Sequence, residues 1–535
     1  MNQACKRTHS EQANLFATTP PRYTHPPQQL IPHLMPDSYS AHGGTDPDTS
    51  LSKLFARLET PDSSDSVQAI DTLRDNLQLL DRSHPTLEQQ EHVLDKLYAR
   101  GATTLEKLIP ALVGIPVPAP RKSRQLIRTI QDVLGALSEQ LMGLYERCDR
   151  TRWPLTHSTP DVVLWRILRI LSRHLLIGNL TASQPGNGVW RTLHKTYDLA
   201  RLHTVTRNVP KEAPRSLQDE YYAAVLLGCA QPASFTAREI LFLDAYLERY
   251  SSQIDSNRDK TGQNPEMFWI DPARDAPATP CSRKPPPQDT SVRFFSCGRL
   301  ADQLANQIAA LDAGRSPLQL GLPDFAATPA GRGVMQRLCS RWGDPAKRRF
   351  PRRRQNYRAH LCVGLMNVFQ LFQTSSAPSE VSNWMVVNES PDGYAIMHVS
   401  GKAGAITVGD VVALRTETGN NWQLCIIRWM LSENPEHIEL GLQILSARAI
   451  AAQIAVRSDT QENSCLPALI LPATPTLRPE ESLVVQSGTL NGRSRNLVLI
   501  IEKDNIEVRE VNTVQLGEQN GQIEIYEIET DPGES

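Results

Sequence analysis

The sequence contains two short stretches whose side chains suit the binding of an anionic ligand. The first is KRRFPRRRQNYR, residues 347–358, with seven basic side chains and no acid. An arginine presents a planar fork of N–H donors that binds phosphate oxygens in pairs. By charge alone, the stretch is as typical of a solvated basic linker or a nonspecific polyanion patch as it is of a specific binding site.

The second stretch is NESPDG, residues 388–393, between two runs of strand-forming residues. Asn388, Ser390 and Gly393 are small or carry an amide, so a ligand can approach such a turn closely. Alone, a turn of this kind is usually structural.

Motifs for catalysis and for metal binding are missing from the sequence. It holds 13 histidines but no HExxH, GxSxG, GxxxxGK[ST] or GxGxxG pattern, and neither GGDEF nor EAL occurs. The nine cysteines include no CxxC pair, which argues against a disulfide framework or a cysteine zinc site. We therefore expect no enzyme and no metal.

Together and in this order, the two stretches resemble the signature of PilZ domains. That signature is RxxxR followed about thirty residues later by [D/N]xSxxG, and Arg354, Arg358, Asn388, Ser390 and Gly393 supply it. The later segments TVGDVVALR, CIIRWM and IELGLQIL also resemble strands of the family. The resemblance covers about 110 of the 535 residues, and the combination of both motifs is more specific than either alone.

The resemblance implies that the chain is a bacterial receptor for the second messenger cyclic di-GMP, with no other cofactor. Arg354 and Arg358 would then bind phosphates and guanine, Asn388 a guanine edge, and Ser390 a phosphate or the base. Gly393 would keep the turn free of a side chain. The six residues that the resemblance assigns to the ligand are Arg353, Arg354, Arg358, Asn388, Ser390 and Gly393, of which Arg353 adds charge only.

Two other classes of function stay open at this point. One is a degenerate PilZ scaffold that binds protein partners without a nucleotide. The other is a nucleic-acid-binding β-barrel, for which the expected stacking aromatics are few apart from Phe350 and Tyr357. The net charge of -2 gives no general reason to expect nucleic acid as a partner.

The elements that must position these residues indicate a multidomain α+β protein. Residues 1–50 are rich in Pro and His and predict a disordered arm. From 51 to 253, apolar residues at three and four spacing predict an all-α domain, as at Val67, Ile70, Leu73, Leu77 and Leu80 behind the cap Asp65. Breakers and short helical segments predict a linker over 254–345.

The C-terminal part of the chain changes to strand patterns. Residues 346–456 predict a PilZ-like six-stranded antiparallel β-barrel, with LCVGLMNVFQLF (361–372) as a strand run and SARAIAAQIAV (446–456) as a closing helix. Residues 457–535 predict a further small all-β domain with an acidic tail.

Features that direct a protein into or across a membrane are absent from the sequence. The N-terminus carries no apolar segment of signal-peptide length, and the most apolar stretch, 162–180, is interrupted by three arginines. We expect a cytoplasmic protein without membrane insertion, in which the barrel relays ligand binding to the helical region and that region contacts an unknown protein partner.

Overall fold

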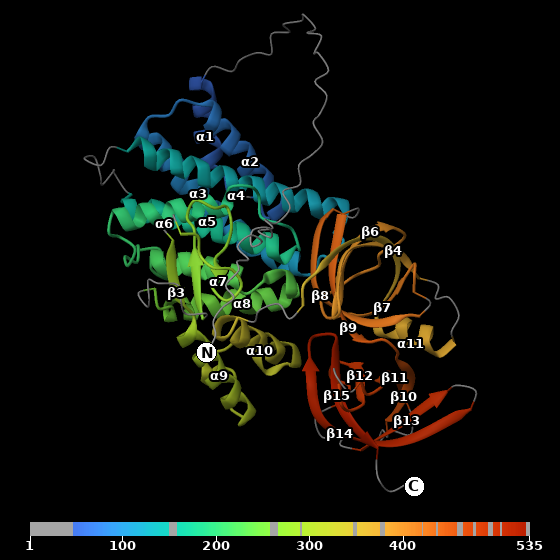
Figure 1. Ribbon diagram of the computed structural model, residues 1–535. Coiled ribbons are helices and arrows are strands. Elements are labelled where there is room, and N and C mark those ends of the chain that lie inside the picture. Colours follow the sequence, from blue (N-terminus) through green and yellow to red (C-terminus); the bar gives the residue numbers. More distant parts are fainter. Residues whose placement is uncertain are drawn as a thin grey trace, which may run out of the picture. The chain divides into compact units, whose positions relative to one another are not determined.

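The computed structural model describes residues 47–530 except 62, 149–157, 257–265, 289–291, 346–349, 375–379, 420, 435–436, 457–463, 475–477, 491–495 and 503–504. Pro47–Ser535 forms one compact unit. Figure 1 shows helices in the first half of this unit and two β-barrels at its end, which confirms the predicted fold class. The predicted disordered arm lies outside the described residues, except for Pro47–Ser50 at the start of a helix.

The N-terminal part of the unit is helical, as predicted. Ile70, Leu73, Leu77 and Leu80 form the buried stripe of one helix, whose first turn is capped by the Asp65 carboxylate. Val67 lies outside that stripe and is 44% exposed. The elements are α1 (Pro47–Glu59), α2 (Ser66–Arg82), α3 (Leu87–Val113), α4 (Arg121–Arg147), α5 (Pro160–Leu180), α6 (Val189–Leu202), α7 (Leu217–Cys229), η2 (Pro232–Ser234), α8 (Ala237–Tyr250) and η3 (Ser251–Gln253).

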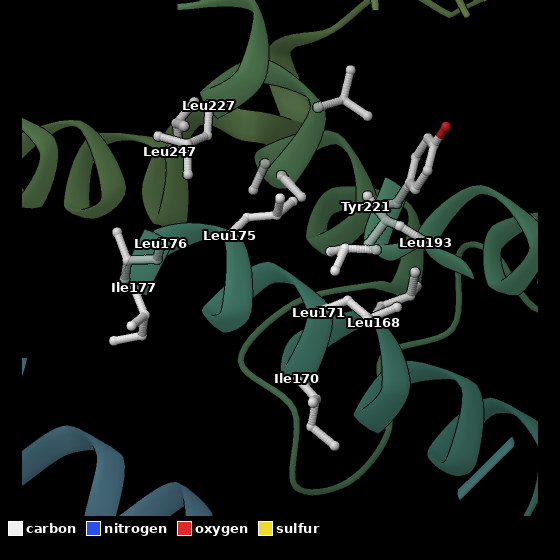
Figure 2. Close-up of a cluster of buried hydrophobic side chains, with 14 of the residues drawn as sticks. Leu168, Ile170, Leu171, Leu175, Leu176, Ile177, Leu193, Tyr221, Leu227 and Leu247 are labelled. Carbon is white, nitrogen blue, oxygen red and sulfur yellow. The ribbon is translucent and has the colours of Figure 1, made fainter. Parts of the chain in front are cut away.

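Helix α5 is buried on nearly all sides, and Figure 2 shows its leucines among side chains of α6, α7 and α8. The arginines that interrupt its apolar sequence are paired with acids of other helices, Arg166 with Asp95 of α3 and the other two with acids of α8. Arg173 lies 2.5 Å from Asp244, and Arg169 lies 2.9 Å from Glu248. No described helix is long and apolar enough to cross a membrane.

The structure differs from the linker predicted for 254–345, because most of this segment is folded onto the helical core. Phe268, Phe295 and Trp342 are fully buried in the same apolar cluster as α5. The breakers that suggested a linker join short elements instead of separating domains. These are β1 (Met267–Ile270), β2 (Thr279–Pro280), β3 (Arg293–Ser296), α9 (Gly298–Asp312), η4 (Leu318–Leu320), η5 (Asp324–Ala327) and α10 (Pro329–Gly343).

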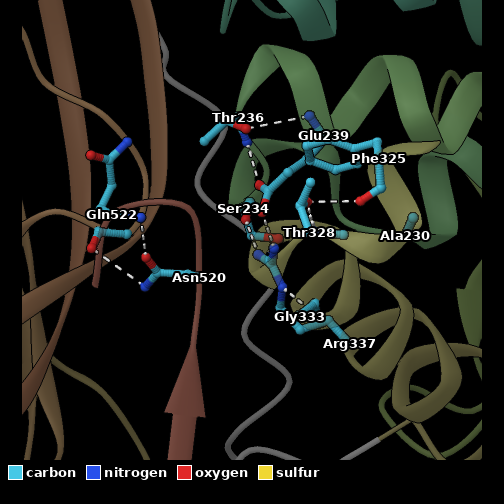
Figure 3. A network of polar contacts seen from close by, with 12 residues as sticks. Ala230, Ser234, Thr236, Glu239, Phe325, Thr328, Gly333, Arg337, Asn520 and Gln522 are labelled. Carbon is cyan, nitrogen blue, oxygen red and sulfur yellow. Dashed lines mark hydrogen bonds and ion pairs between the residues drawn. The ribbon is translucent and has the colours of Figure 1, made fainter. Parts of the chain in front are cut away.

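Helix α10 is held on the helical part by an arginine clamp, drawn in Figure 3. Arg337 donates to the Ser234 carbonyl at 2.8 Å, pairs with Glu239 at 2.5 Å and lies over the Phe235 ring at 4.4 Å from its centroid. One turn before Arg337 on the same face of α10, a Cβ at Gly333 would lie 2.5 Å from the carbonyl oxygen of Gln519 in the last barrel. Helix α10 therefore contacts both the helical core and the C-terminal barrel.

The first barrel is a closed antiparallel sheet in the order β4-β5-β6-β9-β8-β7. Its strands are β4 (Arg353–Val363), β5 (Ser382–Ser390), β6 (Gly393–Ser400), β7 (Val411–Thr416), β8 (Gln423–Asn434) and β9 (His437–Ser446). The predicted strand run 361–372 is wrong beyond Val363. The chain turns at Gly364 into helix α11 (Leu365–Thr374). Gly364 has φ +94°, a positive value that glycine adopts without steric cost because it has no Cβ.

The predicted closing helix is also wrong, since residues 450–456 form the first strand of the second barrel. Alanine favours helices, but here pairing with two strands decides the conformation. The strands are β10 (Ile450–Val456), β11 (Ser464–Leu471), β12 (Ser482–Gln486), β13 (Asn496–Glu502), β14 (Ile506–Gln519) and β15 (Ile523–Thr530). Their order, β10-β11-β12-β15-β14-β13, repeats that of the first barrel strand for strand.

The two barrels contact each other through their outer faces. Val411 and Leu424 of the first barrel and Leu469 and Val484 of the second lie in one buried cluster, together with Val368 of α11. Burial of this kind stabilises by about 25 cal/mol per Å² of apolar surface, so the second barrel supports the first.

Candidate functional site

The residues of the two sequence motifs meet on strands β4 and β5. Arg354 lies directly opposite Asn388 in the antiparallel register, and Ser390 lies opposite Gly393 where β5 turns into β6. Each strand carries one extra residue near this point, between Arg354 and Tyr357 on β4 and between Val386 and Asn388 on β5. Such bulges change which face the following side chains point to.

The face of each side chain follows from the register, because directly opposite residues share a face. Tyr357 and Val386 belong to the barrel interior. Asn388 is paired with Ala395, next to the inward Ile396, so it lies on the outer face, and so does its partner Arg354. Arg358 is paired with Met385 and also lies on the outer face.

Arg353 does not join this group. It lies opposite Glu389 in the strand register, and the Glu389 side chain turns inwards, so Arg353 belongs to the opposite face from Arg354. The Glu389 carboxylate accepts from Tyr357 at 2.5 Å and from Gln355 at 2.6 Å. Burial, followed by the bond to Glu389, raises the pKa of Tyr357 above its usual range, so this hydroxyl stays a donor.

On the outer face, the register partners of the motif residues form a row that crosses the sheet. From Asn388 the register runs to Ala395 on β6, Gly441 on β9 and Trp429 on β8. The two central residues are small, and the Trp429 indole lies across Gly441, where a Cβ would meet Nε1 at 1.8 Å. Trp429 was not predicted, since its position depends on strand register and on no motif.

The arginines of the site are free to bind an anion. Arg354 and Arg358 are exposed, and neither side chain makes a hydrogen bond or ion pair with another residue of the described chain. A guanidinium group without a carboxylate partner keeps all of its donors for a ligand.

Asn388 contributes the opposite kind of group, an unused acceptor. Its Oδ1 is buried and has no hydrogen-bond partner among the described residues. A buried acceptor left unpaired costs about 1–3 kcal/mol, which a ligand N–H would recover. The site therefore offers donors from two arginines and one acceptor from the Asn388 amide, which lies opposite Arg354.

The turn is shaped by Ser390, Asp392 and Gly393. The Ser390 hydroxyl lies 2.6 Å from Asp392 Oδ1 and 3.2 Å from the Gly393 carbonyl. Its proton is thus used within the turn, and its remaining lone pairs can accept from a ligand N–H. A Cβ at Gly393 would lie 2.0 Å from the Leu442 carbonyl oxygen, so only glycine lets β6 approach β9 here.

The arrangement suits an anionic ligand with planar, hydrogen-bonding rings. Two guanidinium forks can take phosphate oxygens or the O6 and N7 edge of guanine, and an amide acceptor can take guanine N–H groups. No group of three or more His, Cys, Asp or Glu side chains within the described ranges could hold a metal ion.

Comparison with known proteins gives matches over most of the chain. A family model described as the N-terminal domain of the cyclic-di-GMP receptor FimW matches residues 52–259. A second, described as the middle PilZ domain of that receptor, matches residues 267–375 and 369–450. The curated cyclic-di-GMP receptor FimW of Pseudomonas aeruginosa is 23% identical over 471 residues, which cover 71% of this chain and 76% of the relative. Cyclic di-GMP is the ligand of this receptor family, whose members are not enzymes.

Proposed function

The chain is a multidomain protein of the PilZ family, and we propose that it is a receptor for cyclic di-GMP that binds the nucleotide on the outer face of its first barrel. The observation that carries the proposal is the buried, unpaired Oδ1 of Asn388 directly opposite Arg354, with Arg358 further along the same outer face; neither arginine has a polar partner among the described residues. A purely structural turn gains nothing from such an acceptor, whereas a guanine N–H would satisfy it.

The residues take different roles in this proposal. Arg354 and Arg358 bind the phosphates and a guanine edge, and Asn388 accepts from a guanine N–H. Ser390 accepts from the base through the lone pairs that the turn leaves unused, and Gly393 holds the turn against β9. Arg353 adds charge from the opposite face without direct contact.

Binding of labelled cyclic di-GMP to single-alanine variants tests these roles. Loss of a charge-assisted hydrogen bond costs about 1.5–3 kcal/mol, so Arg354→Ala and Arg358→Ala should each weaken binding about 10- to 150-fold. Arg353→Ala is the matched control, because it removes the same charge one residue away and should weaken binding by less than about tenfold. Equal losses in all three variants would contradict the assignment.

We further propose that binding is relayed from the first barrel to the other parts. Gly393 is paired with Gln443, whose Oε1 accepts from Arg428 at 2.6 Å. Arg428 also donates to Glu518 of the second barrel at 2.8 Å. The neighbouring Gln519 carbonyl packs on α10, so a contiguous set of contacts runs from the ligand turn to the helical part.

In this account the helical region is the output part and contacts a protein partner inside the cytoplasm. Leu202 and Val209 are exposed apolar side chains on it, at 59% and 58%. The relay predicts that cyclic di-GMP changes the hydrogen exchange of residues 254–345, which include α10. Unchanged exchange there, with ligand shown to be bound, would contradict the relay and leave the receptor proposal intact.

A further inference from the structure

A polar pocket lies in the helical part, between α6, α7 and β3. Its volume is about 460 Å³, within the range of roughly 300–1,000 Å³ that is typical of small-molecule sites. Each helix contributes side chains at i and i+4, which lie on one face of the helix, and β3 contributes neighbouring residues of its strand. The lining residues are Tyr197, Arg201, Thr206, Arg207, Gln218, Tyr222, Ser256, Val292, Arg293 and Phe294.

The pocket carries more positive charge than its neighbours neutralise. Three arginines line it, and the acid that pairs with them is Asp198, at 3.5 Å from Arg201 and 3.2 Å from Arg293. Arg207 is exposed and its side chain has no polar partner in the described part of the chain. Three guanidinium groups less one carboxylate leave two charges for a ligand to balance.

Arg293 is held in place by aromatic rings and, apart from its ion pair with Asp198, leaves its donors unused. Its guanidinium carbon lies 5.2 Å from the Tyr197 ring centroid and 5.4 Å from that of Tyr221, and these two rings stack at 3.9 Å. The side chain is 12% exposed, yet Nε and Nη2 have no hydrogen-bond acceptor among the described residues, and Nη1 has only the Asp198 carboxylate, at 3.2 Å and without hydrogen-bond geometry. Buried donors of this kind are costly unless an acceptor meets them, and a rigid fork loses little entropy on binding.

The other walls of the pocket suit a planar ring. Phe294 is partly exposed and offers a ring surface, and the Gln218 amide carries both a donor and an acceptor in the same lining. Aromatic faces stack bases, and amides read base edges in pairs of hydrogen bonds. Oxygen acceptors, negative charge and a flat ring occur together in a mononucleotide.

We propose that this pocket binds a mononucleotide, with its phosphate on Arg201, Arg207 and Arg293 and its base between Phe294 and Gln218. The site is separate from the barrel residues that the proposed function uses. A helical output part would thereby read a second nucleotide signal in addition to the one bound at the barrel.

Titration calorimetry with GMP, GTP, ATP and pyrophosphate tests this inference on the full chain carrying Arg354→Ala and Arg358→Ala. These two substitutions silence the barrel site, so the result is independent of the receptor proposal. We expect at least one nucleotide to bind more tightly than pyrophosphate. Arg207→Ala, at an exposed position, should weaken that binding at least about tenfold, since a charge-assisted contact is lost.

Two further variants keep the test decisive. Arg293→Lys retains the charge but not the fork and should also weaken binding at least about tenfold, while Arg315→Ala, an exposed arginine after α9, should leave it unchanged. The inference is overturned if no nucleotide binds at millimolar concentration, if pyrophosphate binds as tightly as every nucleotide, or if Arg207→Ala binds as tightly as the chain with Arg207 intact.

Discussion

Replacing Asn388 by leucine should raise the stability of the ligand-free protein and weaken its binding of cyclic di-GMP. The buried Oδ1 of Asn388 has no hydrogen-bond partner in the described chain, and leaving such an acceptor unpaired costs about 1–3 kcal/mol. Leucine has a similar size and no polar atom, so Asn388→Leu removes that cost. The same change deprives a guanine N–H of its acceptor, which should weaken cyclic di-GMP binding about 5- to 150-fold.

Urea unfolding of the ligand-free chain and calorimetric titration with cyclic di-GMP measure the two effects separately. Asn383→Leu is a matched control on the same strand, because the Asn383 amide already donates to Ser400 at 3.2 Å. That variant should be no more stable than the unmodified chain and should bind cyclic di-GMP normally. A less stable Asn388→Leu protein with unchanged affinity would refute the reasoning, since Oδ1 would then be satisfied without a ligand.

Three other substitutions test the fold and the relay. Burial raises the pKa of Asp410 to about 6, so the folded state holds this proton more tightly than the unfolded state. The free energy of unfolding should therefore fall as pH rises from about 4 to 6. Asp410→Asn should remove that fall and raise the free energy of unfolding at pH 7, measured with urea, by about 1–3 kcal/mol. Gly393→Ala should destabilise by about 2 kcal/mol or more because its Cβ meets a backbone oxygen at 2.0 Å, whereas Gly135→Ala, in a helix with nothing within 4 Å, should stabilise by about 0.5–1 kcal/mol. Arg428→Gln should retain cyclic di-GMP binding and lose the ligand-induced change in hydrogen exchange of α10; an unchanged response would exclude its ion pair with Glu518 from the relay.

The sequence predicted the parts of the fold that local patterns determine. Apolar stripes identified the helices, and alternation between turns identified the barrel strands after residue 345. The errors fell where tertiary contacts override local preference. The apolar run after Gly364 became a helix that packs between the barrels, and the alanine-rich segment at 450–456 became a strand because two neighbours pair with it.

The candidate site was predictable in its motifs but not in its geometry. The resemblance to the PilZ signature brought Arg354 and Asn388 into one hypothesis, and the register places them opposite each other. The separation of Arg353 depends on which face each strand residue points to, and bulges that the sequence does not reveal change those faces. Trp429 joins the same outer row only through the pairing of β8 with β9.

Calorimetric titration of cyclic di-GMP into the full chain, beside the Arg354→Ala and Arg358→Ala double variant, tests the central claim most directly. The account predicts saturable binding at micromolar concentration or tighter to the unmodified chain, lost in the double variant while its urea unfolding stays unchanged. Absence of binding to the unmodified chain, or equal binding to both proteins, would contradict the claim that the outer face of the first barrel is a cyclic di-GMP site.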